Sequence, residues 1–418
     1  MGFIYGLFMI LVIFEGIIIQ CKGGGTFSLN REQEEDQPYL PHHLIEAIIG
    51  KTDYHTLRTA VEMKLVFEPD QFMEGVLQNT IILIQPHDSN GRISEFYYDG
   101  DLFVNFGSFQ KLKSFFDKFG DKVKKIEISF DLVRDVETNK KYMNIIKSYT
   151  KNFEELRISC PGDEEYWNKI LDGENGIIFP EVKKFQITGQ SSRNNLNLNL
   201  IFPKLESFKL FGEVADVNCL ENVMGLKELT LCTRSILEQE LDYIFANNEH
   251  MTKIYLAKPN RTQTMHSIAK YLTKLETLKV VYPGVDFLLL ANNNVVVYKL
   301  PSVSHFDITY AEFDERIVIE NLSFEMPNLK KLTLKANEAN DRIVNFINYF
   351  EKLEIVELFV ESYDSVKCIE KLPHIKEFTT TFYKHDFDSL KDLLKNFNKE
   401  SKLQTLKFVN FRESFYQT

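Results

Sequence analysis

The stretch MPNLKKLTLKAN, residues 326–337, places Leu329, Leu332 and Leu334 in the order L-x-x-L-x-L and closes on Asn337. Side chains alternate along a β-strand, so Leu332 and Leu334 are predicted to point to the same, buried side. Thr333, which stands between them, is predicted to face solvent. The amide of Asn337 can bond to neighbouring backbone groups where the strand ends. The stretch therefore predicts a short strand followed by a turn.

The same apolar-x-x-apolar-x-apolar spacing recurs along the chain, with a step of about 25 residues between units. This step lies within the range of about 20–29 residues that is typical of leucine-rich repeats. The other triplets are Val123/Ile126/Ile128, Phe153/Leu156/Ile158, Val182/Phe185/Ile187, Leu205/Phe208/Leu210, Leu226/Leu229/Leu231, Met251/Ile254/Leu256, Leu275/Leu278/Val280, Val303/Phe306/Ile308, Leu353/Val356/Leu358, Ile375/Phe378/Thr380 and Leu403/Leu406/Phe408.

These repeats predict an α/β fold in which residues 121–418 form one leucine-rich-repeat solenoid, a horseshoe with a parallel sheet on its concave face. Segments between the strands are expected to return as helices on the outer side. Three such segments carry apolar residues at helical spacing, namely Leu237/Leu241/Ile244/Phe245, Ile343/Phe346/Ile347/Phe350 and Leu390/Leu393/Leu394/Phe397.

Composition narrows the possible functions. The chain has 418 residues and a net charge of −11, whereas nucleic-acid binders usually carry a basic stripe, so no nucleic-acid partner is expected. The sequence lacks a G-x-S-x-G elbow, a phosphate-binding loop and a C-x-x-C pair. We therefore expect neither an enzyme nor a cofactor or metal site. The five cysteines show no staple-like spacing, which favours free thiols over disulfides.

The N-terminus is apolar from Phe3 to Phe14, and Glu15 interrupts the run. With small residues at Cys21 and Gly23, residues 1–23 are predicted to be a signal peptide, and a signal anchor is the alternative. Residues 24–38 are rich in glycine and charge and are predicted to be a flexible linker. We expect a secreted protein with no membrane segment after signal removal, since no later apolar run is long enough to span a bilayer.

Residues 39–72 are predicted to be helical, because Leu44, Ile45 and Ile48 follow Leu40-Pro41 at helical spacing. One alternative is a helical cap that covers the first repeat, as solenoids require. Residues 73–120 are predicted to be a strand–helix junction. It contains strands over 80–87 and 93–106, the second range with a tight turn at Asp99-Gly100. A helix begins after Ser108 and ends at Gly120.

The segment 39–72 resembles the first half of an F-box, the helical motif that docks on the Skp adaptor of cullin–RING ubiquitin ligases. The resemblance implies adaptor contacts at Leu40, Pro41, Leu44, Ile45 and Ile48. Met63, Lys64 and Phe67 stand where the family has a closing Cys/Arg/Trp cluster.

The order of strands, helix and repeats is similar to that of insect F-box/leucine-rich-repeat proteins. With a signal peptide, the layout is similar to that of the salivary F-box/leucine-rich-repeat effectors of gall midges. This resemblance implies a secreted substrate receptor, delivered into a host cell cytosol, that brings a protein target to a Skp–cullin ligase. The alternative is a secreted extracellular leucine-rich-repeat binder with no ligase link.

The solvent side of the predicted sheet is the expected binding surface. Most of its predicted positions hold small or charged residues, as is usual for a solvated face. The exceptions are apolar residues of the kind that anchor protein partners, so we predict contacts with a protein target at Phe211, Tyr255, Val281, Ile355 and Phe359.

Overall fold

The computed structural model describes residue 77 and residues 80–84, 94–98, 101–105, 109–129, 136–159, 178–189, 197–212, 218–233, 238–257, 262–281, 297–309, 324–336, 340–360, 368–382 and 402–410. All of them belong to the compact unit Glu46–Thr418. The predicted signal peptide, linker and F-box-like segment lie outside the described residues. So do Asn337 and the predicted helix with Leu390 and Phe397.

One fifteen-stranded sheet organises the described part of the chain. From β4 onward its strands are parallel and follow chain order. They are β4 (Lys125–Ser129), β5 (Glu155–Ser159), β6 (Lys184–Thr188), β7 (Ser207–Gly212), β8 (Glu228–Thr233), β9 (Lys253–Ala257), β10 (Thr277–Val281), β12 (His305–Thr309), β14 (Lys331–Ala336), β15 (Ile355–Val360), β16 (Glu377–Phe382) and β17 (Thr405–Asn410). Each contains the last two positions of one predicted triplet.

The sheet also extends to the N-terminal side of the predicted repeats. β1 (Thr80–Ile84) pairs in parallel with both β4 and β3 (Asp101–Asn105), and β2 (Ser94–Tyr98) forms an antiparallel hairpin with β3. The strands predicted over 80–87 and 93–106 are therefore present, and β2 and β3 lie on either side of the position predicted for the turn. They continue the sheet of the repeats.

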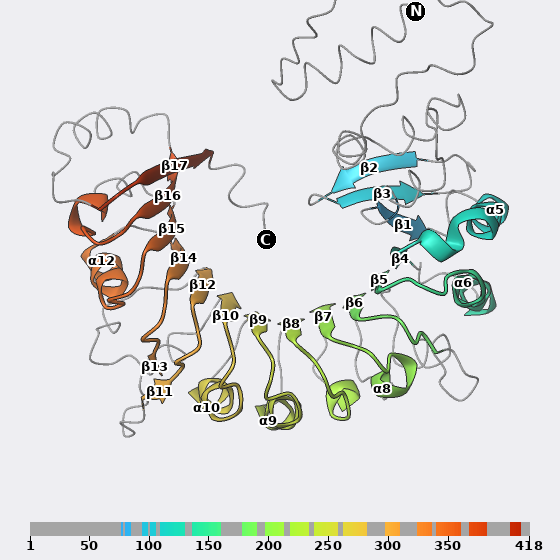
Figure 1. Ribbon diagram of the computed structural model, residues 1–418, viewed down its shortest axis with the longest axis horizontal. Coiled ribbons are helices and arrows are strands. Elements are labelled where there is room, and N and C mark those ends of the chain that lie inside the picture. Colours follow the sequence, from blue (N-terminus) through green and yellow to red (C-terminus); the bar gives the residue numbers. More distant parts are fainter. Residues whose placement is uncertain are drawn as a thin grey trace, which may run out of the picture. The chain divides into compact units, whose positions relative to one another are not determined.

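Helices lie on one side of this sheet, and the strands line the inner side of the array (Figure 1). The helices are α5 (Phe109–Phe119), α6 (Val136–Tyr149), α8 (Leu198–Ile201), α9 (Glu238–Asn247), α10 (Thr262–Tyr271) and α12 (Asp341–Asn348), with short 3₁₀ turns η1 (Gly120–Lys122), η3 (Asn218–Leu220) and η5 (Ile369–Lys371). A two-stranded sheet of β11 (Tyr298–Lys299) and β13 (Phe324–Glu325) completes the described elements. This is the architecture of a leucine-rich-repeat solenoid.

The core is a stack in which each inward residue pairs with the inward residue of the next repeat. Leu332, for example, is in register with Phe306 on one side and Val356 on the other, and all three are fully buried. Burying each such side chain contributes about 1.5–3 kcal/mol. Among the described strands β17 is the last of the sheet and pairs with β16 alone, and its inward residue Phe408 is 37% exposed.

A repeated backbone contact ties each unit to the next. The carbonyl just before each strand accepts two N–H groups from the following repeat. Lys124 O, for example, accepts from Glu154 N at 2.8 Å and from Glu155 N at 3.1 Å. The same pattern recurs through to Lys376 O, which accepts from Gln404 N and Thr405 N. These bonds set the register of one repeat on the next before any side chain contributes.

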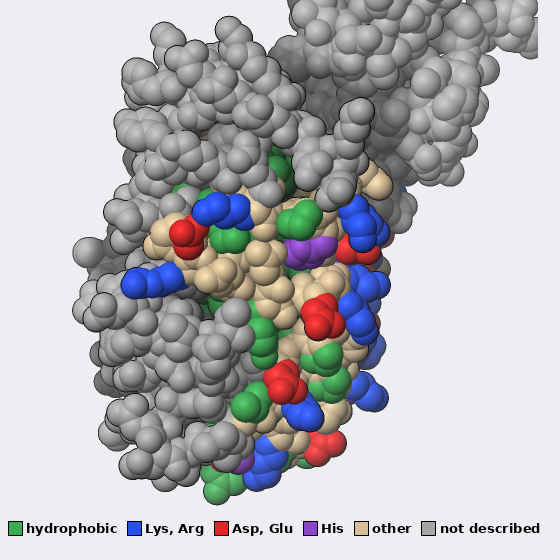
Figure 2. Space-filling view, turned by 90° about the vertical axis from the view of Figure 1, so that its left-hand side faces the viewer, with side chains coloured by type: hydrophobic (Ala, Val, Ile, Leu, Met, Phe, Trp, Pro, Cys, Tyr) green, Lys and Arg blue, Asp and Glu red, His purple; other side chains and the backbone are tan. Residues whose placement is uncertain are grey.

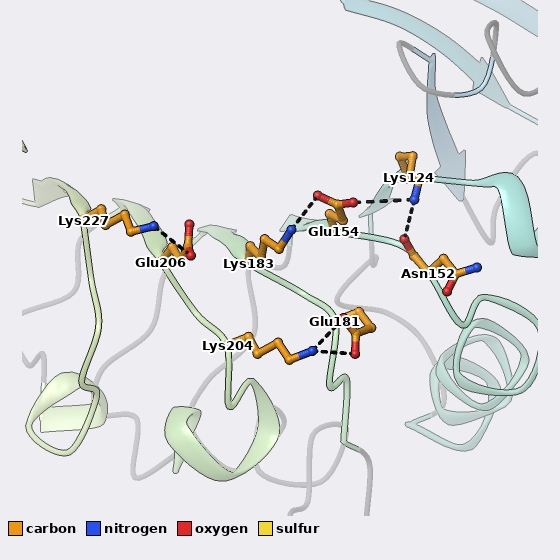
Figure 3. A network of polar contacts seen from close by, with 8 residues as sticks. All are labelled: Lys124, Asn152, Glu154, Glu181, Lys183, Lys204, Glu206 and Lys227. Carbon is orange, nitrogen blue, oxygen red and sulfur yellow. Dashed lines mark hydrogen bonds and ion pairs between the residues drawn. The ribbon is translucent and has the colours of Figure 1, made fainter.

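Charges alternate in sign along the residues that precede the strands (Figure 3). Glu154 lies between Lys124 at 3.5 Å and Lys183 at 3.2 Å, and Glu206 lies 2.9 Å from Lys227. Figure 2 shows the same interspersion of acidic and basic side chains on the side of the array that carries the C-terminal repeats. Exposed pairs of this kind contribute little each, about 0–1 kcal/mol, but they keep like charges apart.

A buried asparagine links α9 to the preceding repeat. The Asn248 amide donates to Val223 O and to Ile244 O, each at 2.9 Å, and its Oδ1 accepts from Leu226 N at 2.8 Å. The side chain is fully buried, so these bonds satisfy backbone groups that no ladder partner reaches. Asn337 was predicted to bond to backbone groups in the same way after the end of a strand, whereas Asn248 does so before the start of β9.

The prediction for Thr333 is wrong. Its side chain is only 6% exposed, and its hydroxyl donates to Glu357 Oε2 at 2.8 Å. Alternation along the strand places it on the side opposite to Leu332, as expected, but neighbouring side chains on that side cover it. Alternation along a strand determines the face of the sheet to which a side chain points, but it does not determine how far that side chain is buried.

Two glycines allow adjacent repeats to approach closely after β6 and within β7. Gly189 N donates to Phe211 O at 2.9 Å, and Gly189 and Gly212 have φ angles of 148° and 154°. A Cβ atom on Gly212 would lie 1.8 Å from Gly189 O. Both the backbone angle and the contact therefore require glycine at position 212.

We expect Gly212→Ala to lower the free energy of unfolding by about 3 kcal/mol or more, because steric overlap adds to backbone strain. The matched control is Gly225→Ala. Gly225 also has a positive φ, 97°, but its added Cβ would meet nothing closer than 3.9 Å. Strain alone should then cost about 1–2 kcal/mol. Equal losses for the two variants in denaturant unfolding would contradict the contact argument.

Candidate protein-binding face

The side chains opposite to the core form a surface that we call the strand face, running over β4–β17. Its central row contains the residue between the two inward positions of each strand. In order, the row is Glu127, Arg157, Gln186, Lys209, Thr230, Tyr255, Lys279, Asp307, Thr333, Glu357, Thr379 and Lys407. Parallel pairing places each member directly beside the next, so residues about 25 positions apart in sequence become neighbours.

Four of the five predicted anchors are partly accessible on the strand face. Phe211, Tyr255, Ile355 and Phe359 are half-buried. Val281 differs from the prediction because it is only 6% exposed. It lies in register between Ala257 and the fully buried Thr309, so its own neighbours on the face cover it. Whether any of the five contacts a partner stays a prediction.

Lys279 is the centre of a first polar group on the face. Its ammonium lies 3.3 Å from the Asp307 carboxylate and 4.9 Å from the centre of the Tyr255 ring. The same carboxylate accepts a hydrogen bond of 3.0 Å from Thr309. An ion pair beside an aromatic ring holds the lysine in a defined position, and the Asp307 side chain is only 13% exposed.

Glu357, on β15, is the centre of a second polar group, three strands away from Lys279. It lies 2.8 Å from Lys331 Nζ and accepts the 2.8 Å hydrogen bond from Thr333. The Thr333 hydroxyl also lies 3.5 Å from His305 Nε2. Two positions further along β14 and β15, Lys335 Nζ lies 5.7 Å from the centre of the Phe359 ring. β12, β14 and β15 thus present a connected set of polar groups in place of independently solvated side chains.

Burial changes the acid–base behaviour of these groups. It lowers the pKa of His305, and the positive charge of Lys331 adds to this effect, while Asp307 and Glu357 oppose it. Burial acts to raise the pKa of Glu357, but the hydrogen bonds from Lys331 and Thr333, together with the positive charge of Lys331, outweigh it and hold that pKa below its usual range. His305 is therefore stabilised in its neutral form and Glu357 in its ionised form.

This polar set was not singled out from the sequence. Its members occupy positions that the repeat pattern predicts to be solvated, and charged residues there are ordinary in leucine-rich repeats. A usable signal was present, because Lys279 and Asp307 hold the same position in consecutive repeats with opposite charge. The burial that makes the contact strong depends on neighbours that the pattern does not specify.

Other predicted sites can be placed only in part. Leu40, Pro41, Leu44, Ile45 and Ile48 lie outside the described residues. Among the residues that the structure describes, no group of three or more His, Cys, Asp or Glu side chains could hold a metal ion. Within the same residues, no helix combines the length and apolar character needed to cross a membrane.

The sequence matches no protein-family model, and no curated protein matches it. Solved structures do show similarity, in 39 matching chains. One is the crystal structure of a TLR13–ssRNA13 complex, with a TM-score of 0.40 and 12% sequence identity. The match covers 71% of this chain and 41% of the TLR13 chain, so this protein spans less than half the length of that structure.

We expect Thr333→Asp to lower the free energy of unfolding by more than about 2 kcal/mol, because the new carboxylate would be buried beside Glu357. Thr230→Asp is the matched control. Thr230 belongs to the same row but is half-buried and lies next to Lys209, so its loss should stay below about 1 kcal/mol. If denaturant unfolding gave a comparable loss of unfolding free energy for both variants, the burial beside Glu357 would not be the cause of the loss at Thr333.

The lowered pKa of His305 predicts a pH dependence of stability. The unfolded chain binds a proton near pH 6.5, whereas the folded chain binds it at lower pH, so stability should decrease as the pH falls below about 6.5. Protonation would place a second cation beside Lys331.

Thermal unfolding of the wild type and His305→Gln between pH 7.5 and 5 measures this effect. The variant should lose less stability over that interval than the wild type does. His266→Gln, at an exposed position of α10, is the control and should follow the wild type. Identical profiles for His305→Gln and the wild type would contradict the prediction.

Proposed function

We propose that this protein is a protein-binding module whose strand face receives a protein target. The observation that carries the proposal is the composition of that face, where the half-buried aromatic residues Phe211, Tyr255 and Phe359 lie among ordered polar groups. Partly exposed aromatic side chains surrounded by polar groups are characteristic of binding hot spots. The solenoid supplies a rigid support for them.

In the finer form of the proposal, the protein is a secreted substrate receptor. Residues 1–23 direct secretion, and the F-box-like segment 39–72 recruits a Skp-type adaptor, through which the target meets a cullin ligase. This part is supported by the sequence resemblance alone. The alternative, an extracellular leucine-rich-repeat binder, keeps the strand face as the binding surface and assigns residues 39–72 to a cap.

The target-binding function can be tested by comparative affinity capture with three forms of the full-length protein. The forms are the wild type, a strand-face variant (Phe211→Asp with Tyr255→Asp) and an outer-surface control, Tyr243→Asp. Tyr243 lies on α9 and is 63% exposed. Its substitution therefore removes an exposed aromatic side chain that lies outside the strand face. We expect specific partners to be retained by the control and lost by the strand-face variant. Partners lost from both variants, or from neither, would refute the strand face as the binding surface.

The adaptor function needs a separate measurement. Purified Skp-type adaptor should bind the wild-type protein, and Leu44→Asp with Ile48→Asp should abolish binding while the thermal transition of the repeats stays unchanged. Absence of adaptor binding by the wild type would favour the extracellular binder.

A further inference from the structure

Two lysines on the strand face have no acidic partner among the described residues, whereas neighbouring lysines do. In the same repeats, Lys183, Lys204, Lys227 and Lys253 are paired with Glu154, Glu181, Glu206 and Glu228, at 3.2, 2.7, 2.9 and 2.6 Å. Figure 3 shows the first three of these pairs. Lys184 on β6 and Lys209 on β7 are exposed, and no acidic side chain among the described residues lies within ion-pair distance of either.

The acidic residues beside Lys184 and Lys209 on the strand face already have other partners. Glu155, which is in register with Lys184, lies 2.7 Å from Arg157 Nε. The charges of both lysines also lower the pKa of Glu228 on β8, but Glu228 accepts its hydrogen bond from Lys253. Burial acts to raise the pKa of Glu228, and the three lysines together hold that pKa below its usual range. The charged side chains at the strand-face positions of β6–β9 are Lys184, Lys209, Lys253 and Glu228, so this part of the face carries a net positive charge within a chain of net charge −11.

Aromatic and polar side chains adjoin the two lysines. Gln186 is in register with Lys209, and Phe211 with Cys232. Lys209 is in register with Thr230, and Thr230 with Tyr255, whose side chain hydrogen-bonds with the Cys232 thiol. These side chains therefore occupy adjacent positions of the strand face. We call Lys184, Lys209, Phe211, Cys232 and Tyr255 the β6–β9 patch.

We propose that the β6–β9 patch binds an acidic segment of a protein partner, with carboxylates at Lys184 and Lys209 and an apolar side chain against Phe211 and Tyr255. The inference rests on the proposed function and specifies the partner's chemistry. Two unmatched ammonium groups beside aromatic rings complement a segment that alternates acidic and apolar residues.

The charge of the whole chain favours a protein over a nucleic acid as the source of the negative groups. A polyanion carries its charge over a long distance and is repelled by a protein of net charge −11. A short acidic segment on a folded partner meets mainly the local charge, because salt screens interactions beyond about 8–10 Å.

The test uses fluorescence anisotropy with the full-length protein and three labelled 12-residue peptides. All three share one central phenylalanine and one leucine, and their remaining positions are Asp/Glu with Ser, Ser/Gly, or Lys/Arg with Ser. A 12-nucleotide single-stranded RNA is the fourth probe. We expect the acidic peptide to bind at least about tenfold more tightly than the neutral one, and the basic peptide and RNA to bind more weakly still.

Two double variants test whether the preference for the acidic peptide depends on Lys184 and Lys209. Lys184→Glu with Lys209→Glu should reverse the preference toward the basic peptide, and Lys184→Gln with Lys209→Gln should abolish it without placing new carboxylates beside Glu228. The control is Lys113→Glu with Lys274→Glu, on α5 and on the turn before β10. Both control positions are exposed, and the change in net charge equals that of the Lys184/Lys209 reversal. It should leave the preference for the acidic peptide intact.

Each other outcome overturns the inference. Binding that ignores peptide charge, or that the control abolishes equally, would remove the patch as the cause. RNA binding that depends on Lys184 and Lys209 and matches the acidic peptide would replace the protein segment with a polyanion. If no peptide binds, the acidic-segment inference fails, while the capture experiment with Phe211 and Tyr255 variants still decides the broader function.

Discussion

The register of one repeat on the next is the constraint on which the rest of the structure depends. A single strand and its return segment cannot enclose an apolar core, so each unit is stable only when the next unit covers it. The carbonyls before the strands, each accepting two N–H groups, fix that stacking without reference to side-chain identity. Inward residues then meet inward residues, and this is why Phe, Leu, Ile and Val can replace one another along the stack.

The same register creates the strand face. Residues that a repeat length separates in sequence become direct neighbours, and this brings Lys279 to Asp307 and Thr333 to Glu357. Over β10–β15 these neighbours satisfy one another and are largely buried. Over β6–β9 the lysines outnumber the carboxylates and remain exposed. The strand face thus has two parts. Over β10–β15 the charged side chains pair with one another, and over β6–β9 positive charge remains available to a partner.

Much of the fold could be predicted from the sequence because it follows from a local, periodic cause. The triplet around Leu332 and its repeats predicted the parallel strands of the large sheet from β4 to β17, their order and, except in β17, their buried positions, and Ser108 with Gly120 bounded α5 correctly. The small sheet of β11 and β13 was not predicted. Thr333 and Val281 were misplaced for one reason. Their depth depends on which side chains flank them across strands, and periodicity in one strand carries no information about that. The polar set around Glu357 was missed on the same ground.

The alternating signs along Lys124, Glu154, Lys183, Glu206 and Lys227 also bear on how such an array can change its length. Removing one unit, for instance the one that carries Glu154, would place Lys124 directly beside Lys183 and set like charges against each other. Removing two consecutive units would restore a lysine next to a glutamate. In this segment, genetic gain or loss of repeats should therefore be tolerated in pairs more readily than singly.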